Sequence, residues 1–379
     1  MSNSEGASAD FELFTSLRYD PILLDCAENS SPTLNFEPPS RFYMLVYHRD
    51  RMLEASQYFD WGNVANTLKD GVGFSRTLLS EVESYQAEKG SNDEPLKVRV
   101  LFNRAGELKV DCVPVPRVPL ETLYPKSLNP PSGSNTTCTQ QPSKPFKPSP
   151  LTGGALELGP EDRVISGSTS KPIPPTWLLT LDTEPTPSSP HTALKTTHRP
   201  HYDAARARAL PSPSSGPGRT GAQSTTTGTE MYETLLYNEC DEITEGSLTS
   251  VYFFRGGRWV TPPVGVPADL SRRARSLTSA SSTDGTSDAL TEEATPENPY
   301  RENRDEGELR RPFPGRWGHS VRSEKVAGGG GQRGTTRRWA LQKALCVEEP
   351  VGKDTVRVGE GVWVSNGVRG FGYGTVIKR

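Results

Sequence analysis

The chain has 379 residues, which is enough for two domains that each bury a core. Its 43 Lys and Arg nearly balance 46 Asp and Glu, and the resulting net charge of −3 gives no reason to expect nucleic acid or a membrane as a partner. A low apolar fraction of 33%, together with 34 Pro and 35 Gly, indicates compact parts that alternate with unstructured insertions.

The cysteines and the first residues bear on redox state and location. No two cysteines have the spacing of a zinc or redox motif, so we expect reduced thiols and no metal site; they are Cys26, Cys112, Cys138, Cys240 and Cys346. The start, MSNSEGASADFELF, lacks the pattern of a signal peptide. No apolar run approaches the ~20 residues that span a bilayer. These features predict a soluble, cytoplasmic protein.

The first part of the chain reads as an α+β domain. RFYMLVYHRDRMLEASQYFDW predicts a strand that runs into an amphipathic helix, and a second helix is expected over 63–88, with Gly71 and Gly73 leaving its start open. KVRVLFNRAGELKVDCVPV alternates apolar and polar residues on both sides of Ala105-Gly106, as a β-hairpin does.

A first domain is expected to end near residue 185. Residues 126–171 are rich in Pro, Ser, Thr and Gly and are predicted to be an insertion, because such a composition buries too little apolar surface to offset its ordering entropy. The strand-like WLLTLD at 177–182 is expected to close this N-terminal domain, 1–185.

The remainder, 186–379, is predicted to be a β-rich domain. It opens with a helix in KTTHRPHYDAARARAL, and the segment from Tyr232 contains three short β-like runs with Gly256-Gly257 placed for a tight hairpin. GTTRRWALQKAL is expected to be a helix, and GVWVSNGVRGFGYGTVI a β-rich tail. Disordered insertions are expected at about 210–229 and 267–330.

Two ionisable residues could carry chemistry. Lys195 follows small and apolar residues at the expected domain junction, where a partly desolvated amine can form a Schiff base with an aldehyde cofactor; a surface lysine is the alternative. Glu245, in EITEG, could be an exposed turn residue. In a pyridoxal enzyme, however, such a carboxylate holds the pyridine nitrogen protonated.

Gly334 to Arg337 opens a helix directly after a flexible segment. Free backbone N–H groups and the helix dipole at that place could bind a phosphate. Ordinary capping by Thr335 or Thr336 is the alternative.

Several ordered segments together resemble the class IV aminotransferase family of pyridoxal-phosphate enzymes, in the order of that family. They are FELFTSLRYDP, RFYMLVYHRDRML, HTALKTTHRPHYDAARA, YNECDEITEGSLTSVYFFRGGRWVTPP, GGQRGTTRRWAL and VWVSNGVRGF. The resemblance implies fold type IV, an α+β fold of two domains with the cofactor between them, and a homodimer acting on a small molecule. It also implies that Lys195 binds pyridoxal 5'-phosphate covalently and that Glu245 contacts the pyridine nitrogen.

The same resemblance implies the groups that hold the cofactor phosphate. Arg51, in YHRDRM, falls where the family has a His, two variable residues and an Arg. Thr335 and Thr336, with Asn366 and Gly367 of SNGVRG, would complete the phosphate site. Substrate carboxylates need cationic donors, for which Arg18, Arg199 and Arg369 are candidates because each lies in a matched segment.

Within the family, SNGVRGF is similar to the Asn-Ser-x-Arg-Gly pattern of aminodeoxychorismate lyases. The combination of KTTHR, the GGRWVTPP hairpin and GTTRRWAL with long Ser/Pro insertions resembles the fungal form. The expected activity is therefore a 4-amino-4-deoxychorismate lyase that gives 4-aminobenzoate and pyruvate for folate biosynthesis. A class IV transaminase of branched-chain or D-amino acids is the alternative, and a non-enzymatic scaffold is a third. Two departures are Ser250 in place of the usual Asn, and GQRG in place of Leu-Pro-Gly.

Overall fold

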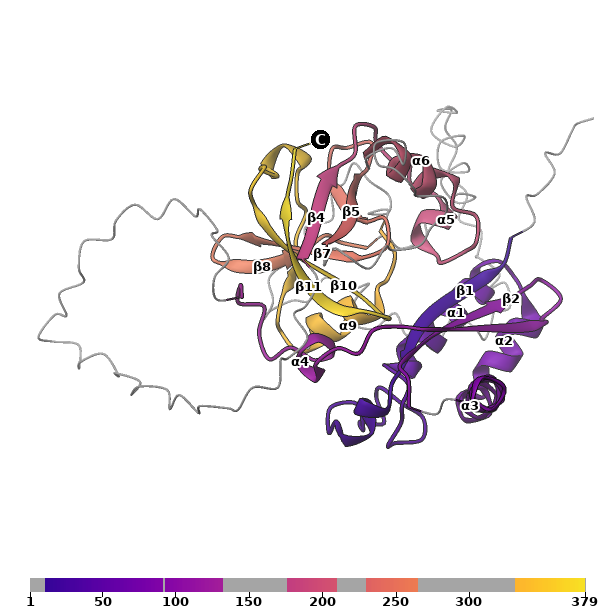
Figure 1. The fold of residues 1–379 in the computed structure, drawn as a ribbon. Coiled ribbons are helices and arrows are strands. Elements are labelled where there is room, and N and C mark those ends of the chain that lie inside the picture. The colour runs from indigo at the N-terminus through magenta and orange to yellow at the C-terminus, as the bar shows by residue number, and fades with distance from the viewer. Residues whose placement is uncertain (1–10, 91–92, 132–175, 210–229, 265–330, 379) are drawn as a thin grey trace, which may run out of the picture.

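The computed structural model describes residues 11–90, 93–131, 176–209, 230–264 and 331–378. These residues form an α+β fold, as the sequence predicted, with one sheet of three strands and one of eight. Figure 1 shows the smaller sheet with its helices on one side of the molecule and the larger sheet, drawn in magenta to yellow, on the other.

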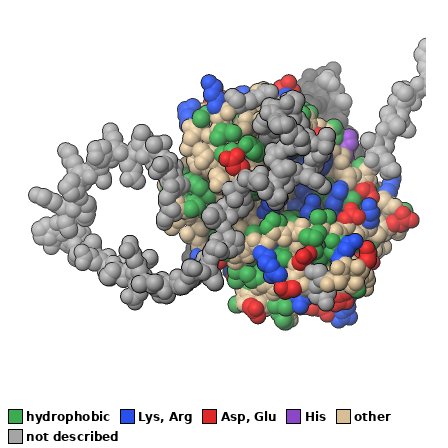
Figure 2. Space-filling view, viewed as in Figure 1, with side chains coloured by type: hydrophobic (Ala, Val, Ile, Leu, Met, Phe, Trp, Pro, Cys, Tyr) green, Lys and Arg blue, Asp and Glu red, His purple; other side chains and the backbone are tan. Residues whose placement is uncertain are grey.

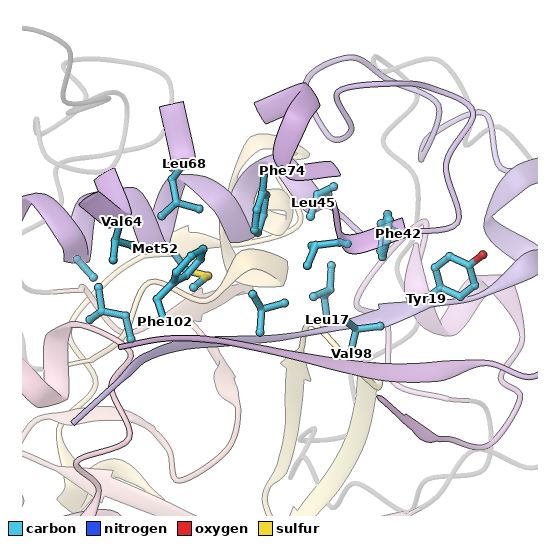
Figure 3. Packing of buried hydrophobic residues seen from close by; sticks show 14 of the residues in the cluster. Leu17, Tyr19, Phe42, Leu45, Met52, Val64, Leu68, Phe74, Val98 and Phe102 are labelled. Atoms are coloured by element: carbon cyan, nitrogen blue, oxygen red, sulfur yellow. The ribbon is translucent and has the colours of Figure 1, made fainter. Parts of the chain in front are cut away.

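The smaller sheet consists of β1 (Leu13–Tyr19), β2 (Leu96–Phe102) and β3 (Leu108–Pro114), paired antiparallel in that order. The expected hairpin of β2 and β3 is therefore present. Three helices cover one face of this sheet: α1 (Leu45–Tyr58), α2 (Gly62–Lys69) and α3 (Gly71–Lys89). Figure 3 shows Leu17, Val98 and Phe102 of the sheet beneath Met52, Leu68 and Phe74 of the helices.

Strand alternation divides the residues of β1 and β2 between two faces. Leu17 pairs with Val98 in the core, whereas Ser16 and Arg18 pair with Arg99 and Lys97 on the opposite face. The face turned away from the helices is therefore polar and cationic.

The helical region differs from the prediction in two ways. The single helix expected over 63–88 is two helices, because the chain breaks at Asp70, whose side chain caps α3 by accepting from the N–H of Gly73. The strand expected before α1 is reduced to one bridge between Phe42 and Tyr19. A 3-10 helix, η1 (Pro21–Asp25), follows β1 instead.

The larger sheet has the strand order β6-β5-β4-β11-β10-β7-β8-β9. Its third strand, β4 (Thr176–Leu181), pairs parallel with β5 (Glu230–Tyr237) on one side and with β11 (Gly370–Val376) on the other. The prediction that this strand closes the first domain is wrong. Parallel neighbours come from distant parts of the chain, so local sequence does not reveal which sheet such a strand joins.

The other strands of this sheet are β6 (Ile243–Gly246), β7 (Ser250–Arg255), β8 (Arg258–Thr261), β9 (Val347–Glu348) and β10 (Gly361–Asn366). The segment expected to hold three strands thus holds four, β5 to β8. Gly256 and Gly257 both have positive φ in the β7–β8 turn, so this hairpin is confirmed.

Short helices connect these strands. They are α4 (Leu120–Leu123), α5 (Pro190–Ala193), α6 (Pro200–Ala209), α9 (Thr335–Gln342) and the 3-10 helix η3 (Lys353–Thr355). The helices expected in KTTHRPHYDAARARAL and GTTRRWALQKAL correspond to α6 and α9.

Most of the insertions predicted at 126–171, 210–229 and 267–330 lie outside the described residues. Among the helices that the structure does describe, none combines the length and the apolar character that a membrane crossing requires.

Candidate active site

Lys195 lies where the two sheets approach each other. Ser189 and Thr192 form a capping box on α5, the helix ends at Ala193, and the chain then runs extended beside β1. The carbonyl oxygen of Lys195 accepts from the N–H of Phe14 at 3.2 Å. This backbone pairing fixes the position of Lys195 relative to the smaller sheet.

The amine of Lys195 is poised to be a nucleophile. Its Nζ lies 4.8 Å from the centre of the Phe14 ring and 3.5 Å from Oε1 of Gln332. Burial lowers the pKa of this amine well below its ordinary value, Arg51 and Arg199 lower it further, and Glu245 opposes them. A lowered pKa increases the neutral fraction of the amine, and the neutral form is the one that can attack a carbonyl carbon.

Glu245 lies on β6, almost fully buried at 9% exposure. Its Oε1 accepts a 2.5 Å hydrogen bond from the hydroxyl of Tyr202, which belongs to α6. Burial raises the pKa of Glu245 to about 7, although the Tyr202 hydrogen bond and the charge of Lys195 work against this rise. Glu245 is therefore a buried acid beside a partly buried base, the arrangement typical of acid-base sites.

A second carboxylate fixes the turn that follows Glu245. Glu233, which is fully buried, accepts from the hydroxyls of Ser247 and Thr249 at 2.5 and 2.8 Å and from the N–H of Leu248 at 3.1 Å. A Cβ on Gly246 would lie 2.9 Å from the Glu233 side chain, so glycine permits this close approach. The turn that carries Glu245 is thereby held rigidly.

A hydrogen-bonded chain runs from α1 to the start of α9. Arg51 donates from Nη2 to Thr15 Oγ1 at 2.6 Å, and Thr15 Oγ1 lies 2.7 Å from Nδ1 of His48. Nε2 of His48 is 3.3 Å from Thr335 Oγ1. A guanidinium can only donate, so Thr15 Oγ1 accepts from Arg51 and its own hydroxyl can donate a hydrogen bond to Nδ1 of a neutral His48. The hydroxyl proton of Thr335 then stays available for an anion.

The charge states of His48 and Arg51 agree with these hydrogen-bond directions. Burial lowers the pKa of His48 well below its ordinary value, and the charges of Arg51 and Lys195 lower it further. Burial lowers the pKa of Arg51 to about 10, so the guanidinium stays charged at neutral pH. Its buried Nε has no hydrogen-bond partner among the residues that the structure describes.

The N-terminus of α9 completes an anion cradle next to Arg51. Gly334 occupies the N-cap position and has no side chain that could cap the helix, which leaves backbone N–H groups of the first turn without an N-cap partner. A Cβ on Gly367 would lie 2.5 Å from Cε1 of His48 and 3.1 Å from Oγ1 of Thr335. Glycine at 367 therefore lets the β10–β11 turn approach this helix closely.

The remaining residues proposed for the phosphate site have other protein partners. Thr336 Oγ1 lies 2.8 Å from Ser365 Oγ, and Asn366 Oδ1 accepts from the N–H groups of Val368 and Arg369 at 3.0 and 2.9 Å. Asn366 thus shapes the turn that carries Gly367. Ser250, the departure noted in the sequence, lies against Gly334, where a Cβ would come within 2.2 Å of its Oγ.

The three arginines suggested for substrate binding differ in their surroundings. Arg18 is 1% exposed and donates to Asp20, to the carbonyl oxygen of Val368 and to that of Pro116, which favours a structural role. Arg199 donates to the carbonyl oxygen of Ser247 at 2.7 Å, and its guanidinium lies over the Tyr202 ring.

Arg369, in the β10–β11 turn, lies near two cations of β2 on the polar face of the smaller sheet. We call this group the cationic face: Lys97, Arg99 and Arg369. Burial lowers the pKa of Lys97, and Arg99 and Arg369 lower it further. The Arg99 guanidinium lies 5.1 Å from the centre of the Phe14 ring, the same ring that Lys195 contacts. Within the described residues, no acidic side chain pairs with these three cations at salt-bridge distance. Figure 2 shows Lys and Arg side chains gathered in the hollow between the two halves of the molecule.

Sequence reasoning did not single out several of these residues. Lys97 and Arg99 alternate with Val98 and Val100, and that alternation alone could have predicted two cations on one face. Tyr202 and Gln332 had no comparable signal, because their partners are distant in the sequence.

Comparisons with protein-family models and with curated proteins give no match. Among solved structures, the chain is similar to the fold IV-transaminase CpuTA1 from Curtobacterium pusillum, with 11% identity, a TM-score of 0.44 and coverage of 97% of this chain and 79% of that one. It is similar to the branched-chain amino acid aminotransferase from Escherichia coli, with 10% identity, a TM-score of 0.42 and coverage of 97% and 77%. It is also similar to 4-amino-4-deoxychorismate lyase from Pseudomonas aeruginosa, with 13% identity, a TM-score of 0.40 and coverage of 97% and 83%. At these values, a function has to be assigned from the side chains described above.

Proposed function

We propose that this protein is a pyridoxal-phosphate enzyme of fold type IV, with the cofactor between the two sheets. One observation carries the proposal: a partly buried amine of lowered pKa, Lys195, lies among Glu245, Arg51 and the cradle at α9. The cofactor needs an amine for its aldehyde, an acid for its pyridine nitrogen and an anion site for its phosphate. Arg51 Nε, which has no partner within the described part of the chain, and the start of α9, whose N-cap residue is a glycine, fit the phosphate.

Each residue has a distinct role in this proposal. When bound, the cofactor supplies an electron sink that makes a proton on the carbon next to the substrate amine acidic. Lys195 holds the cofactor and, once displaced by the substrate, moves that proton as a base. Glu245 keeps a proton on the pyridine nitrogen, which maintains the sink. Arg51, Thr335, Thr336 and Gly367 hold the phosphate, and Asn366 shapes the turn.

For the substrate, we propose 4-amino-4-deoxychorismate, cleaved to 4-aminobenzoate and pyruvate. The cationic face supports this choice, since three half-buried cations with no acidic partner among the described residues favour an anionic substrate that brings more than one carboxylate. Arg369 fits this role better than Arg18, whose guanidinium is occupied by protein groups. Arg199 is tied to the Ser247 carbonyl oxygen and fits a supporting role near Tyr202.

The second candidate is a class IV transaminase of branched-chain or D-amino acids, which would use Lys195 and Glu245 in the same way. A branched-chain amino acid brings only one carboxylate, so it would leave part of the cationic face uncompensated. We also propose a soluble, cytoplasmic homodimer, in line with the family resemblance of the sequence.

The deciding experiment is fluorescence detection of 4-aminobenzoate from aminodeoxychorismate, with purified protein and added pyridoxal phosphate. The proposal expects product from the wild type and none from Lys195→Ala. Amino-group transfer to a keto acid without 4-aminobenzoate would favour the transaminase. A wild type that gains no visible absorption band dependent on Lys195 would overturn both.

A further inference from the structure

Gln332 connects the two central residues of the candidate site. It is buried and directly precedes the segment that leads into α9. Its Oε1 lies 3.5 Å from Nζ of Lys195, and its Nε2 donates to the Tyr202 hydroxyl at 3.0 Å. Its backbone N–H also donates to the carboxylate of Glu245. One residue thus contacts the base directly and the acid both directly and through Tyr202.

The chemistry of the groups sets the direction of these hydrogen bonds. An amide nitrogen cannot accept, so the Tyr202 oxygen accepts from Gln332 and its proton goes to Oε1 of Glu245. An amine donates to the amide oxygen on the other side. Turning the amide over would set its NH₂ group against the Lys195 amine and remove the donor to Tyr202. The amide of Gln332 is therefore held in one orientation by its two neighbours.

The backbone at this position is placed by its glycine neighbour. A Cβ on Gly331 would lie 2.8 Å from the carbonyl oxygen of Thr244, the residue before Glu245. Glycine at 331 lets this segment run against β6 closely enough for the Gln332 N–H to reach the carboxylate. The contact is therefore built into both the backbone and the side chain.

We propose that Gln332, acting with Tyr202, is a positioning residue that couples Lys195 to Glu245, so that the hydrogen-bonded chain Gln332–Tyr202–Glu245 orients the acid while the amide oxygen orients the amine. This inference rests on the proposed function for its catalytic meaning. The hydrogen-bonded chain itself belongs to the protein without cofactor and can be tested there.

The hydrogen bonds of Gln332 have two consequences for the charges of the site. Donation from Tyr202 and from the Gln332 N–H stabilises the charged form of a carboxylate that burial otherwise destabilises. The amide oxygen stabilises the protonated amine of Lys195, against the burial and the cations Arg51, Arg199 and Lys97 that lower its pKa. Loss of the amide should therefore disturb both groups at once.

The test uses two readouts on the full chain. The first is the NMR titration of ¹³Cε-labelled lysine in the cofactor-free protein, with the Lys195 signal assigned by its loss in Lys195→Ala. Gln332→Leu should lower the titration midpoint of Lys195 by about 0.7 pH unit, because it removes an acceptor worth about 1 kcal/mol. Gln332→Glu has the same shape but adds a negative charge, so it should move the midpoint the other way.

The second readout is the dissociation constant of pyridoxal phosphate, measured by absorbance. Gln332→Leu and Tyr202→Phe should each weaken binding by about tenfold, since each removes a hydrogen bond that supports a charged group. The double variant should weaken binding by a factor far smaller than the product of the two single-variant factors, because both side chains act through the same series of hydrogen bonds. Gln86→Leu, a buried glutamine of α3 remote from the site, is the matched control and should change neither readout.

The outcomes separate the inference from the proposed function. An unchanged titration midpoint of Lys195 in both Gln332 variants would overturn the inference. A double variant whose loss of pyridoxal phosphate affinity equals the product of the losses in Gln332→Leu and Tyr202→Phe would overturn it too. If the wild type binds no pyridoxal phosphate, the proposed function fails, yet the NMR titration still tests the chain. If Gln332→Leu does not fold, the opposite shift expected for the isosteric Gln332→Glu carries the test.

Discussion

The backbone N–H of Arg18 donates to the carbonyl oxygen of Gly367 at 2.9 Å, which joins β1 of the smaller sheet to the β10–β11 turn of the larger one. The side chain of Arg18 reinforces this junction by donating to the carbonyl oxygen of Val368. Arg51 and His48 reach the anion cradle from the smaller part, and Thr335 and Gly367 reach it from the larger. The cradle therefore exists only when the two parts are docked.

The phosphate cradle can be tested apart from the rest of the site by changing Arg51. Arg51→Gln should weaken pyridoxal phosphate binding by about 10- to 100-fold, because charged hydrogen bonds contribute about 1.5–3 kcal/mol each. Binding of pyridoxal, which lacks the phosphate, should change little. Absorbance titration of both compounds measures the two affinities.

Arg49→Gln is the control, since Arg49 lies on the same helix but pairs with Asp50 and the carbonyl oxygen of Leu68. If Arg51→Gln weakened both compounds equally, Arg51 would not be a phosphate ligand.

A methyl group at Gly367 should disturb the same cradle sterically. In Gly367→Ala the new Cβ would lie 2.5 Å from Cε1 of His48, and the histidine has little room to move because it is fully buried. We expect a lower melting temperature together with weaker pyridoxal phosphate binding. Gly62→Ala is the matched control, because a Cβ there meets nothing within 4 Å. Equal melting temperatures for the two variants would contradict the close approach.

The sequence predicts local features of this fold better than distant ones. The hairpin of β2 and β3 and the β7–β8 turn follow from alternation and paired glycines, which are local signals. The Lys195, Glu245 and Arg51 positions came from the family resemblance, and the structure brings them together. Gln332 lies 137 residues beyond Lys195, and no period or spacing links two such residues. The place of β4 in the larger sheet escaped prediction for the same reason.

Glu245 should make the stability of the cofactor-free protein depend on pH. Burial raises its pKa from 4.5 to about 7, so between these values the folded protein retains a proton that the unfolded chain has lost. The free energy of unfolding should therefore fall as pH rises through this window. Glu245→Gln removes the effect and should gain up to roughly 3 kcal/mol relative to the wild type between pH 4.5 and 7.

Denaturant unfolding at several pH values measures this difference. The lowered pKa of Lys195 works in the opposite sense, since the folded protein then binds fewer protons below pH 10.5 and stability rises with pH. The contribution of Lys195 is present in the wild type and in Glu245→Gln, so the difference between their free energies of unfolding reports mainly on Glu245. Glu239→Gln, at an exposed glutamate, should follow the wild type. A pH-independent difference for Glu245→Gln would argue against a buried carboxyl.

The cationic face should determine affinity for the substrate and not for the cofactor. Arg99→Gln and Lys97→Gln should each raise KM for aminodeoxychorismate by about tenfold or more, because each removes a cation that pairs with a carboxylate. Pyridoxal phosphate affinity should stay near the wild-type value, since neither residue belongs to the cradle. Lys109→Gln is the control, because Lys109 is exposed on β3 and pairs with Asp111. Removing Lys97 relieves repulsion on Lys195 as well, so its pKa should rise slightly and the pH profile should shift upward. An unchanged KM in Arg99→Gln would show that the substrate carboxylates bind elsewhere.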